Sequence, residues 1–144
     1  MIDRFKGKYD FLSNFFSCLV EYDGELYPSV EHAFQAAKTL DRENREYISL
    51  TETAKEARSV GRRMKGIRED WDEVKLGIME ELVRYKFSHY SDLKEKLLKT
   101  GDDILVEGNT WNDTYWGVCK GVGENHLGKI LMKVREELRS GERE

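Results

Sequence analysis

The first clear pattern in the chain is a pair of short strand-like segments. Residues Cys18–Tyr22 and Glu25–Tyr27, which are rich in apolar and aromatic side chains, flank Asp23-Gly24. This dipeptide is favoured in the two-residue type I′ turns that join antiparallel strands. The sequence therefore predicts a β-hairpin, which Pro28 ends because proline cannot donate to a strand ladder.

A helix is predicted directly after the hairpin, over about residues 29–39. Ser29 is a good cap residue for its N-terminus. The apolar residues recur at helical spacing, so they form a buried stripe. Its members are Val30, Ala33, Phe34 and Ala37, and the polar residues that border this stripe at spacings of four and three are Glu31, Gln35 and Lys38.

Further helices follow from the same periodicity and from capping signals. Thr53-x-x-Glu56 is a capping-box pattern, which starts a helix that we expect to stop near Gly61. The other expected helices cover Arg42–Leu50, about residues 70–88, residues from Ser91 to Thr100-Gly101, and a last helix capped by Asn125, with a frayed tail after about residue 139; the basic residues Arg62, Arg63, Lys65 and Arg68 are expected in a loop.

The segment from Glu107 to Gly123 breaks this helical pattern. It follows the short apolar run 104–106, which is more typical of a strand than of a helix, and it is rich in glycine, tryptophan and side-chain amides. A long ordered loop in a compact domain is usually functional. The chain as a whole is predicted to be a single α+β domain over residues 1–144, mainly helical, with a small antiparallel β element and this Gly/Trp-rich loop. Strands and helices do not alternate along the sequence, so a doubly wound sheet is not expected.

Composition narrows the class of protein. Apolar residues make up 39% and charged residues 36%, with a net charge of −4, which argues against a protein held to nucleic acid mainly by bulk charge. Cys18 and Cys119 form no CxxC pair, so reduced thiols are expected. No signal peptide and no apolar run long enough to span a membrane are visible. We expect a soluble protein of the cytoplasm that does not bind membranes.

Two groups of polar residues are candidates for chemistry. Glu31, Gln35 and Lys38 put a carboxylate, an amide and an amine on one helix face, although a solvated helix side would look the same. Asp113 lies between two tryptophans, where lost hydration would raise its pKa and suit it to proton transfer. The alternative is an aspartate that caps backbone amides in a turn. Trp116 could stack on a base or ribose, or could be part of the core.

The remaining polar signals are weaker. Residues 121–125 contain two glycines before a helix N-terminus, which can cradle a phosphate, although the pattern is more typical of an ordinary loop and cap. Glu107 could point a carboxylate into a cleft or lie exposed at a strand end. We expect Lys75 and Lys86 to pack their stems on the core and reach water with their ammonium groups. The histidines lack metal-ligand spacing or a nucleophile partner, and we expect structural roles for them: His32, His89 and His126.

Taken together, these motifs resemble the NADAR family, the YbiA-like N-glycosidases. The resemblance covers almost the whole chain in order. It is carried by Phe11-Leu-Ser-Asn-Phe15, Tyr27-Pro-Ser-Val-Glu-His-Ala-Phe-Gln-Ala-Ala-Lys38, Ala57 with Gly61, Trp71-Asp72 with Lys75 and Met79, Lys86-Phe87, Leu105-Val-Glu107, Asp113-x-x-Trp-Gly117, Gly123-x-Asn125, Leu127-Gly128, Leu131-Met132 and Arg135. Val30 and His89-Tyr90 stand where other residues are frequent in the family. These differences bear on substrate preference and not on membership of the family.

The resemblance implies hydrolysis of an N-glycosidic bond between a phosphorylated ribose and an exocyclic amine. Two substrate classes go with the family: phosphoribosylamino-pyrimidine intermediates of riboflavin biosynthesis, and ADP-ribose on the guanine amino group, in a nucleotide or in nucleic acid. No cofactor and no metal are implied, and the oligomeric state is open. The expected catalytic residues are Glu31, Lys38 and Asp113, and the expected substrate-binding residues are Asn14, Phe15, Gln35, Glu107, Trp116, Gly117, Gly123 and Asn125.

Two mechanisms remain open at this point. A desolvated Lys38 could form a Schiff base with the ring-opened sugar, while Glu31 and Asp113 move protons. Alternatively, the two carboxyl groups could act directly, one on the leaving group and one on water. Two other functions also remain open: a module that binds ADP-ribose or a nucleotide without turnover, and a repair hydrolase whose Arg62–Arg68 segment contacts nucleic-acid phosphates.

Overall fold

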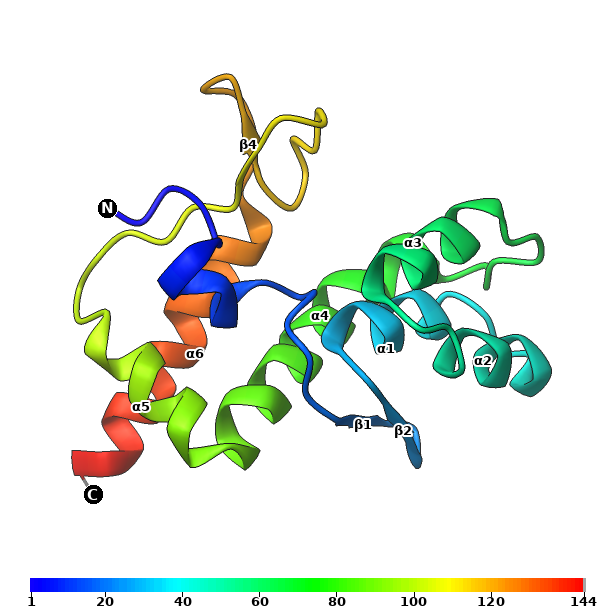
Figure 1. Ribbon diagram of the computed structural model, residues 1–144, viewed down its shortest axis with the longest axis horizontal. Helices are drawn as coiled ribbons and strands as arrows, with labels where there is room; N and C mark the ends of the chain where they lie inside the picture. Colours follow the sequence, from blue (N-terminus) through cyan, green and yellow to red (C-terminus); the bar gives the residue numbers. More distant parts are fainter. Residues whose placement is uncertain (144) are drawn as a thin grey trace. The chain divides into compact units, whose positions relative to one another are not determined.

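The computed structural model shows a mainly helical chain with a few short strands, and it describes residues 1–143, with side chains up to residue 141 (Figure 1). The α+β, mainly α class predicted from the sequence is confirmed. The helices are the 3-10 helix η1 (Gly7–Leu12) and the α-helices α1 (Val30–Ala37), α2 (Arg42–Ser49), α3 (Ala54–Arg63), α4 (Trp71–His89), α5 (Ser91–Lys99) and α6 (His126–Arg143). The strands are β1 (Val20–Tyr22), β2 (Glu25–Tyr27), β3 (Gly108–Asn109) and β4 (Val118–Cys119).

The contacts within the chain divide it into two compact units. Unit 1 consists of Met1–Ser13 and the chain from Phe87 onwards, and unit 2 consists of Asn14–Lys86. Unit 1 therefore contains α5, α6 and the Gly/Trp-rich loop, while unit 2 contains the hairpin, α1, α2, α3 and most of α4. That residues 1–144 act as one domain stays a prediction.

The predicted hairpin is present in unit 2. Strands β1 and β2 pair antiparallel with Tyr22 opposite Glu25, so Asp23 and Gly24 form a two-residue turn. Both turn residues have positive φ, 51° and 83°, as a type I′ turn requires. Arg45 on α2 holds the turn, because its Nη1 donates to Asp23 Oδ2 at 2.7 Å.

Helix α1 begins where the sequence predicts but is buried more completely. The Ser29 hydroxyl accepts a hydrogen bond from the backbone N–H of His32, which confirms the predicted cap. Every residue from Val30 to Ala37 is buried, because α1 packs against α2, α3 and both strands of the hairpin. The expectation that Glu31 and Gln35 only border the buried stripe is therefore wrong, since both lie inside unit 2.

Helix α3 differs from the prediction at its C-terminus. Thr53 caps it by accepting from the Glu56 N–H at 3.1 Å, as predicted. The helix does not stop at Gly61 but continues to Arg63, so Arg62 and Arg63 lie in its last turn and not in a loop. Positive side chains in the last turn are favoured by the helix dipole, and a glycine inside a helix is tolerated where packing requires it.

Helix α4 buries one charged side chain that we expected to reach water. Lys86 is 1% exposed, and its Nζ lies 5.1 Å from the centre of the Phe16 ring in the segment before the hairpin. A cation over an aromatic face recovers part of the lost hydration. Lys75 is half-buried, and its ammonium group bonds to Asp72 at 3.2 Å.

In unit 1 the strand expected at residues 104–106 is reduced to an isolated bridge. Ile2 donates to the Ile104 carbonyl and accepts from the Val106 N–H, both at 2.8 Å, and Leu105 is the bridge partner of Ile2. The pairing stops there, since the chain turns into the Gly/Trp-rich loop after residue 106. Leu105 is nonetheless fully buried.

Helix α6 is longer than expected, because the tail predicted to fray after about residue 139 is helical up to Arg143. Arg139 anchors this end: its guanidinium donates to Asp102 at 2.9 Å and to the Gly101 carbonyl. Glu144 lies outside the described residues.

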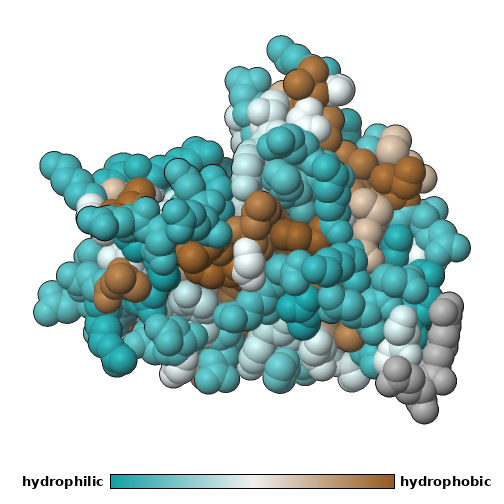
Figure 2. Space-filling model, turned by 180° about the vertical axis from the view of Figure 1, so that it is seen from behind, coloured by the Kyte–Doolittle hydropathy of each residue, from teal (hydrophilic) through white to brown (hydrophobic). Residues whose placement is uncertain are grey.

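The surface agrees with the high content of charged residues. Figure 2 shows hydrophilic residues over most of the face seen from behind. Within the described part of the chain, no helix is both long enough and apolar enough to cross a bilayer.

Candidate functional site

The acid and the amide predicted on α1 form a buried pair in unit 2. Gln35 Nε2 donates to Glu31 Oε1 at 2.9 Å, and the two residues are only 4% and 7% exposed. Burial raises the pKa of Glu31, because a carboxylate loses hydration there. The hydrogen bond from Gln35 and the positive charges of Arg58, Lys38 and Arg62 lower this pKa in part.

Lys38 follows α1 as its C-cap residue and is half-buried. Burial lowers its pKa, the Glu31 carboxylate raises it, and the charges of Arg62 and Lys75 lower it further. The Lys38 carbonyl accepts from the Arg68 N–H at 2.8 Å, which fixes the chain after α3 to the end of α1. The acid and the amine of α1 are thus shifted toward their neutral forms, the states that can exchange protons at neutral pH.

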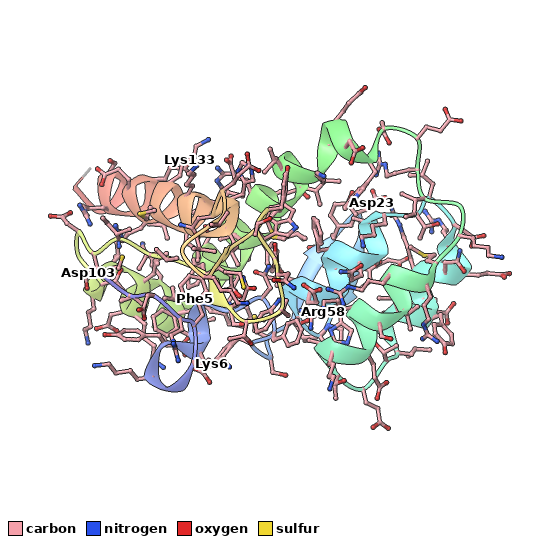
Figure 3. All side chains as sticks on the ribbon, turned by 90° about the horizontal axis from the view of Figure 1, so that it is seen from above. Phe5, Lys6, Asp23, Arg58, Asp103 and Lys133 are labelled. Atoms are coloured by element: carbon pink, nitrogen blue, oxygen red, sulfur yellow. The ribbon has the colours of Figure 1, made fainter. Side chains whose placement is uncertain are left out.

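Helix α3 approaches α1 at Gly61. Built onto this glycine, a Cβ atom would coincide with the Gln35 amide group, so no side chain fits between the helices. Arg58 and Arg62 lie one turn apart on α3, on either side of Gly61 in the sequence, and Figure 3 labels Arg58 on this helix. The spacing of four between the two arginines is visible in the sequence, but only the position of α3 shows that their charges act on Glu31.

The segment before the hairpin completes this site. The Asn14 carbonyl accepts from the Glu31 N–H at 3.1 Å, which satisfies one of the open donors of the α1 N-terminus. The Asn14 amide contacts the Met79 sulfur at 3.5 Å. Phe15 is 39% exposed, and the Arg58 guanidinium lies over its ring at 4.9 Å. Unit 2 therefore brings together Asn14, Phe15, Glu31, Gln35, Lys38, Arg58 and Arg62, which we call the α1–α3 site.

His32 has the structural role predicted for it. Its Nε2 bonds to the Thr51 carbonyl at 3.1 Å, and its Nδ1 lies 2.7 Å from the Ser29 hydroxyl. A carbonyl can only accept, so Nε2 carries the proton and Nδ1 accepts from the hydroxyl. Burial lowers the pKa of His32, which keeps the ring neutral.

In unit 1 the Gly/Trp-rich loop is organised by Asn109, a residue that the sequence did not single out. Its side-chain oxygen accepts from the N–H groups of Trp111 and Asp113, and its amide nitrogen donates to the Asp113 carbonyl at 2.9 Å. The two-residue strands β3 and β4, which pair in parallel, close the ends of this loop. Because the Asn109 side chain both accepts from and donates to the backbone of its own loop, its role can be recognised only in the folded loop.

Asp113 makes the contacts of the turn aspartate that was the alternative interpretation. Its Oδ1 accepts from the N–H groups of Tyr115 and Trp116, at 3.1 and 2.9 Å. Trp116 packs edge-on against Tyr115, with ring centres 4.9 Å apart, and lies 6.3 Å from His126. The catalytic role of Asp113 and the stacking role of Trp116 stay predictions.

The N–H groups that lead into α6 serve the loop, as expected for the ordinary loop and cap that was the alternative interpretation of residues 121–125. The N–H groups of Glu124, Asn125 and His126 donate to the backbone carbonyls of Thr114, Gly117 and Tyr115 at 2.8 to 3.3 Å. These three amides are therefore not available to a phosphate, and phosphate binding by residues 121–125 stays a prediction. Gly117 and Gly123 are needed for packing, since a Cβ on either would meet the backbone, of residue 107 for the first and of residues 117 and 118 for the second.

Asn125 directly precedes α6 as predicted, and its carbonyl accepts from the Lys129 N–H at 3.0 Å, while its side chain joins two other segments. Its Oδ1 accepts from the Glu107 N–H at 3.0 Å, and its Nδ2 donates to the Leu105 carbonyl at 2.9 Å. Asn125 has φ 53°, a left-handed conformation that asparagine tolerates better than most residues. It thereby fixes the backbone that carries Glu107, and binding of substrate by Glu107, Gly117, Gly123 and Asn125 stays a prediction.

We predict that Asn125→Gly lowers the free energy of unfolding by about 2–6 kcal/mol, because it leaves two backbone groups without partners, each worth about 1–3 kcal/mol. Glycine accepts the positive φ, so the substitution isolates the side chain. Urea unfolding measures the effect. The control is Asn44→Ala, at an exposed position of α2, which should change stability by less than about 0.5 kcal/mol. Alanine is used there because glycine would weaken the helix. Equal stability of Asn125→Gly and the unmodified protein would contradict this role.

We predict that Glu31→Gln stabilises the protein at neutral pH. The pKa of Glu31 in the folded protein is raised above its ordinary value of 4.5. The buried carboxyl group therefore contributes fully to stability below about pH 4.5, where it is protonated, and this contribution is lost as the pH rises through the folded pKa. Glutamine stays neutral, so the variant should melt a few degrees higher at pH 7.5, and the difference should vanish toward pH 4.5. Calorimetry over this range is the measurement. Glu43→Gln, exposed on α2, should show no such trend, and a less stable Glu31→Gln at pH 7.5 would contradict the prediction.

Comparison with known proteins agrees with this architecture. The NADAR domain family model matches residues 3–139. An N-glycosidase of Nostoc punctiforme is 42% identical over 137 residues, which cover 92% of this chain and 87% of that protein. N-glycosidase YbiA of Escherichia coli is 41% identical over 132 residues, covering 90% and 82%. The NMR structure of the E. coli protein YbiA matches 100% of this chain and 90% of that chain, with a TM-score of 0.87 and 37% identity.

A longer protein is also related to this chain. A riboflavin biosynthesis protein of Vibrio vulnificus is 39% identical over 130 residues, which are 89% of this chain but only 35% of that protein. The family expected from the motifs is thus confirmed over nearly the whole sequence. The chain belongs to the NADAR family, and it is an enzyme of the N-glycosidase class.

Proposed function

We propose that this N-glycosidase hydrolyses the bond between a phosphorylated ribose and an exocyclic amine, at the α1–α3 site. The observation that carries the proposal is the buried Glu31 on the same stripe of α1 as the half-buried Lys38. Burial raises the pKa of the acid and lowers the pKa of the amine. A protonated acid and a neutral amine are the groups that cleavage of such a bond requires.

Two substrates fit this chemistry, and both carry an exocyclic nitrogen on the anomeric carbon. One is a phosphoribosylamino-pyrimidine, which the relationship to the riboflavin biosynthesis protein of V. vulnificus supports. The other is ADP-ribose on the amino group of guanine. Their shared feature is that the nitrogen keeps a proton, so the sugar ring can open.

The first mechanism uses Lys38 as the nucleophile. The bond from the anomeric carbon to the ring oxygen breaks, the oxygen takes a proton from Glu31, and the exocyclic nitrogen forms a double bond to the carbon and returns its own proton to the Glu31 carboxylate, which leaves an imine. The neutral Lys38 amine then adds to this carbon, the imine nitrogen takes a proton from Glu31, and a proton of the new lysine ammonium returns to Glu31. The carbon–nitrogen bond to the leaving amine breaks as that amine takes up this proton, and a protonated lysine Schiff base remains. Water adds to the resulting lysine Schiff base, and release of the sugar aldehyde restores Lys38.

The second mechanism needs no bond to Lys38. Glu31 protonates the leaving amine, another carboxylate activates water, and the amine leaves as positive charge develops on the sugar. Asp113 is our candidate for the second carboxylate. In this scheme Lys38 only orients the substrate.

Borohydride distinguishes the two mechanisms. During turnover of a phosphoribosylamino-pyrimidine, reduction should leave a covalent sugar adduct on Lys38, detected by mass spectrometry of the peptide, because borohydride reduces a Schiff base to a stable amine. Lys55→Ala, which removes an exposed lysine of α3, should keep this adduct, and Lys38→Ala should lose it. Turnover without any adduct would favour direct displacement.

Release of the free amine tests the function itself. We expect a panel of phosphorylated N-ribosides, including ADP-ribosylated guanosine, to yield free amine, and Glu31→Gln to slow release by about 10²–10⁴-fold because a proton-transfer group is lost. Asp113→Asn should have an effect of similar size if Asp113 moves a proton. Saturable binding of these compounds with no product would instead identify a non-catalytic nucleotide-binding module.

A further inference from the structure

The α1–α3 site carries a surplus of positive charge for which the acid–amine pair alone gives no reason. Arg58, Lys38 and Arg62 act on the Glu31 carboxyl, and Arg62 also acts on Lys38, as does Lys75, whose own charge is paired with Asp72. Each of these positive charges lowers the pKa of the group that it acts on. A cluster in which cations outnumber the one buried carboxyl is suited to bind an anion.

The arginines of α3 are held in place by the close approach of two helices. Ala57 and Gly61 are buried, and the Cβ position of residue 61 is taken by the Gln35 amide. Residues 58 and 62 are neighbours of this contact on the same helix, at a spacing that puts their side chains on one face. Arg58 is half-buried and Arg62 is exposed, so a ligand can reach this face from solvent.

Arg58 is further oriented by Phe15. Its guanidinium lies over the ring at 4.9 Å. A guanidinium that stacks through its face donates hydrogen bonds through its edge, in the fork geometry that matches phosphate oxygens. A stacked arginine therefore loses less conformational freedom when it binds a phosphate than a mobile one does.

We propose that Arg58 and Arg62 form the subsite for the phosphate group of the ribose, so that the enzyme selects phosphorylated N-ribosides over the corresponding nucleosides. This inference rests on the proposed function for the identity of the substrate. It assigns phosphate recognition to the arginine face of α3 in unit 2 and not to residues 124–126 of unit 1, whose amides are already bonded within the loop.

The alternative is that the two arginines only offset the charge of Glu31. In that case their loss would change the pH dependence of catalysis equally for phosphorylated and dephosphorylated substrates. A phosphate subsite makes a different demand, because the loss of an arginine should harm only the phosphorylated compound. The ratio of kcat/KM for the two compounds therefore separates the two roles.

The experiment compares Arg58→Gln and Arg62→Gln with Arg63→Gln, which removes the same charge from a neighbouring exposed position whose Nε bonds to the Ser59 carbonyl of its own helix. One readout is kcat/KM for a phosphoribosylamino-pyrimidine and for its dephosphorylated nucleoside. We expect the first two variants to lose about tenfold or more for the phosphorylated compound, mainly in KM, and to change little for the nucleoside. Arg63→Gln should behave like the unmodified protein, and Arg58→Lys should restore part of the loss because it keeps the charge but not the fork.

Calorimetric binding of ribose 5-phosphate provides a readout that does not depend on turnover. We expect Arg58→Gln and Arg62→Gln to weaken this binding by about tenfold or more and Arg63→Gln to leave it unchanged. Melting temperatures close to that of the unmodified protein exclude misfolding as the cause. Equal binding of ribose 5-phosphate by all three glutamine variants would overturn the phosphate subsite. Failure to release amine from any N-riboside, with arginine-dependent binding intact, would overturn the proposed function and leave the subsite supported.

Discussion

The chemistry proposed for this protein depends on one constraint: the carboxyl group of Glu31 belongs to a helix that is buried on all its faces. Helix α1 is only a few turns long, and none of its residues is exposed. A short helix has little stability of its own in water, so its position comes from packing against α2, α3 and the hairpin. That packing removes water from Glu31, and the removal of water gives the acid its altered proton affinity.

The same constraint explains why α3 contains a glycine near its C-terminal end. In isolation, Gly61 reads as a stop signal, because glycine is common just after helices. In the folded chain it lies within the helix, since only a residue without a side chain leaves room for the Gln35 amide. The local pattern was ambiguous between the two roles, and the contact between distant segments decided it.

Much of the local structure could be predicted from the sequence. The turn at Asp23-Gly24 and the caps Ser29 and Thr53 were correct because each depends on residues close in the chain. The errors have one common cause, which is a partner far away in the sequence. Lys86, which the sequence places with its ammonium group in water, lies against Phe16. Asn125 stands before α6 as predicted, but its side-chain bonds to residues 105 and 107 could not be foreseen. Of the candidate site, the sequence pattern brings together Glu31 and Gln35 on α1 and Lys38 at its C-cap, whereas Arg58 joins them only through the packing of α3.

The charges of α3 also link occupancy of the site to its protonation. Without a bound anion, the positive charges of Arg58 and Arg62 lower the pKa of Glu31 and so offset part of the effect of burial. An anion seated on those guanidinium groups cancels much of that pull, and the carboxyl then binds its proton more tightly. On our proposal, binding of a phosphorylated ligand would thus strengthen the hold of Glu31 on its proton, so that the acid is most fully protonated when a substrate is bound.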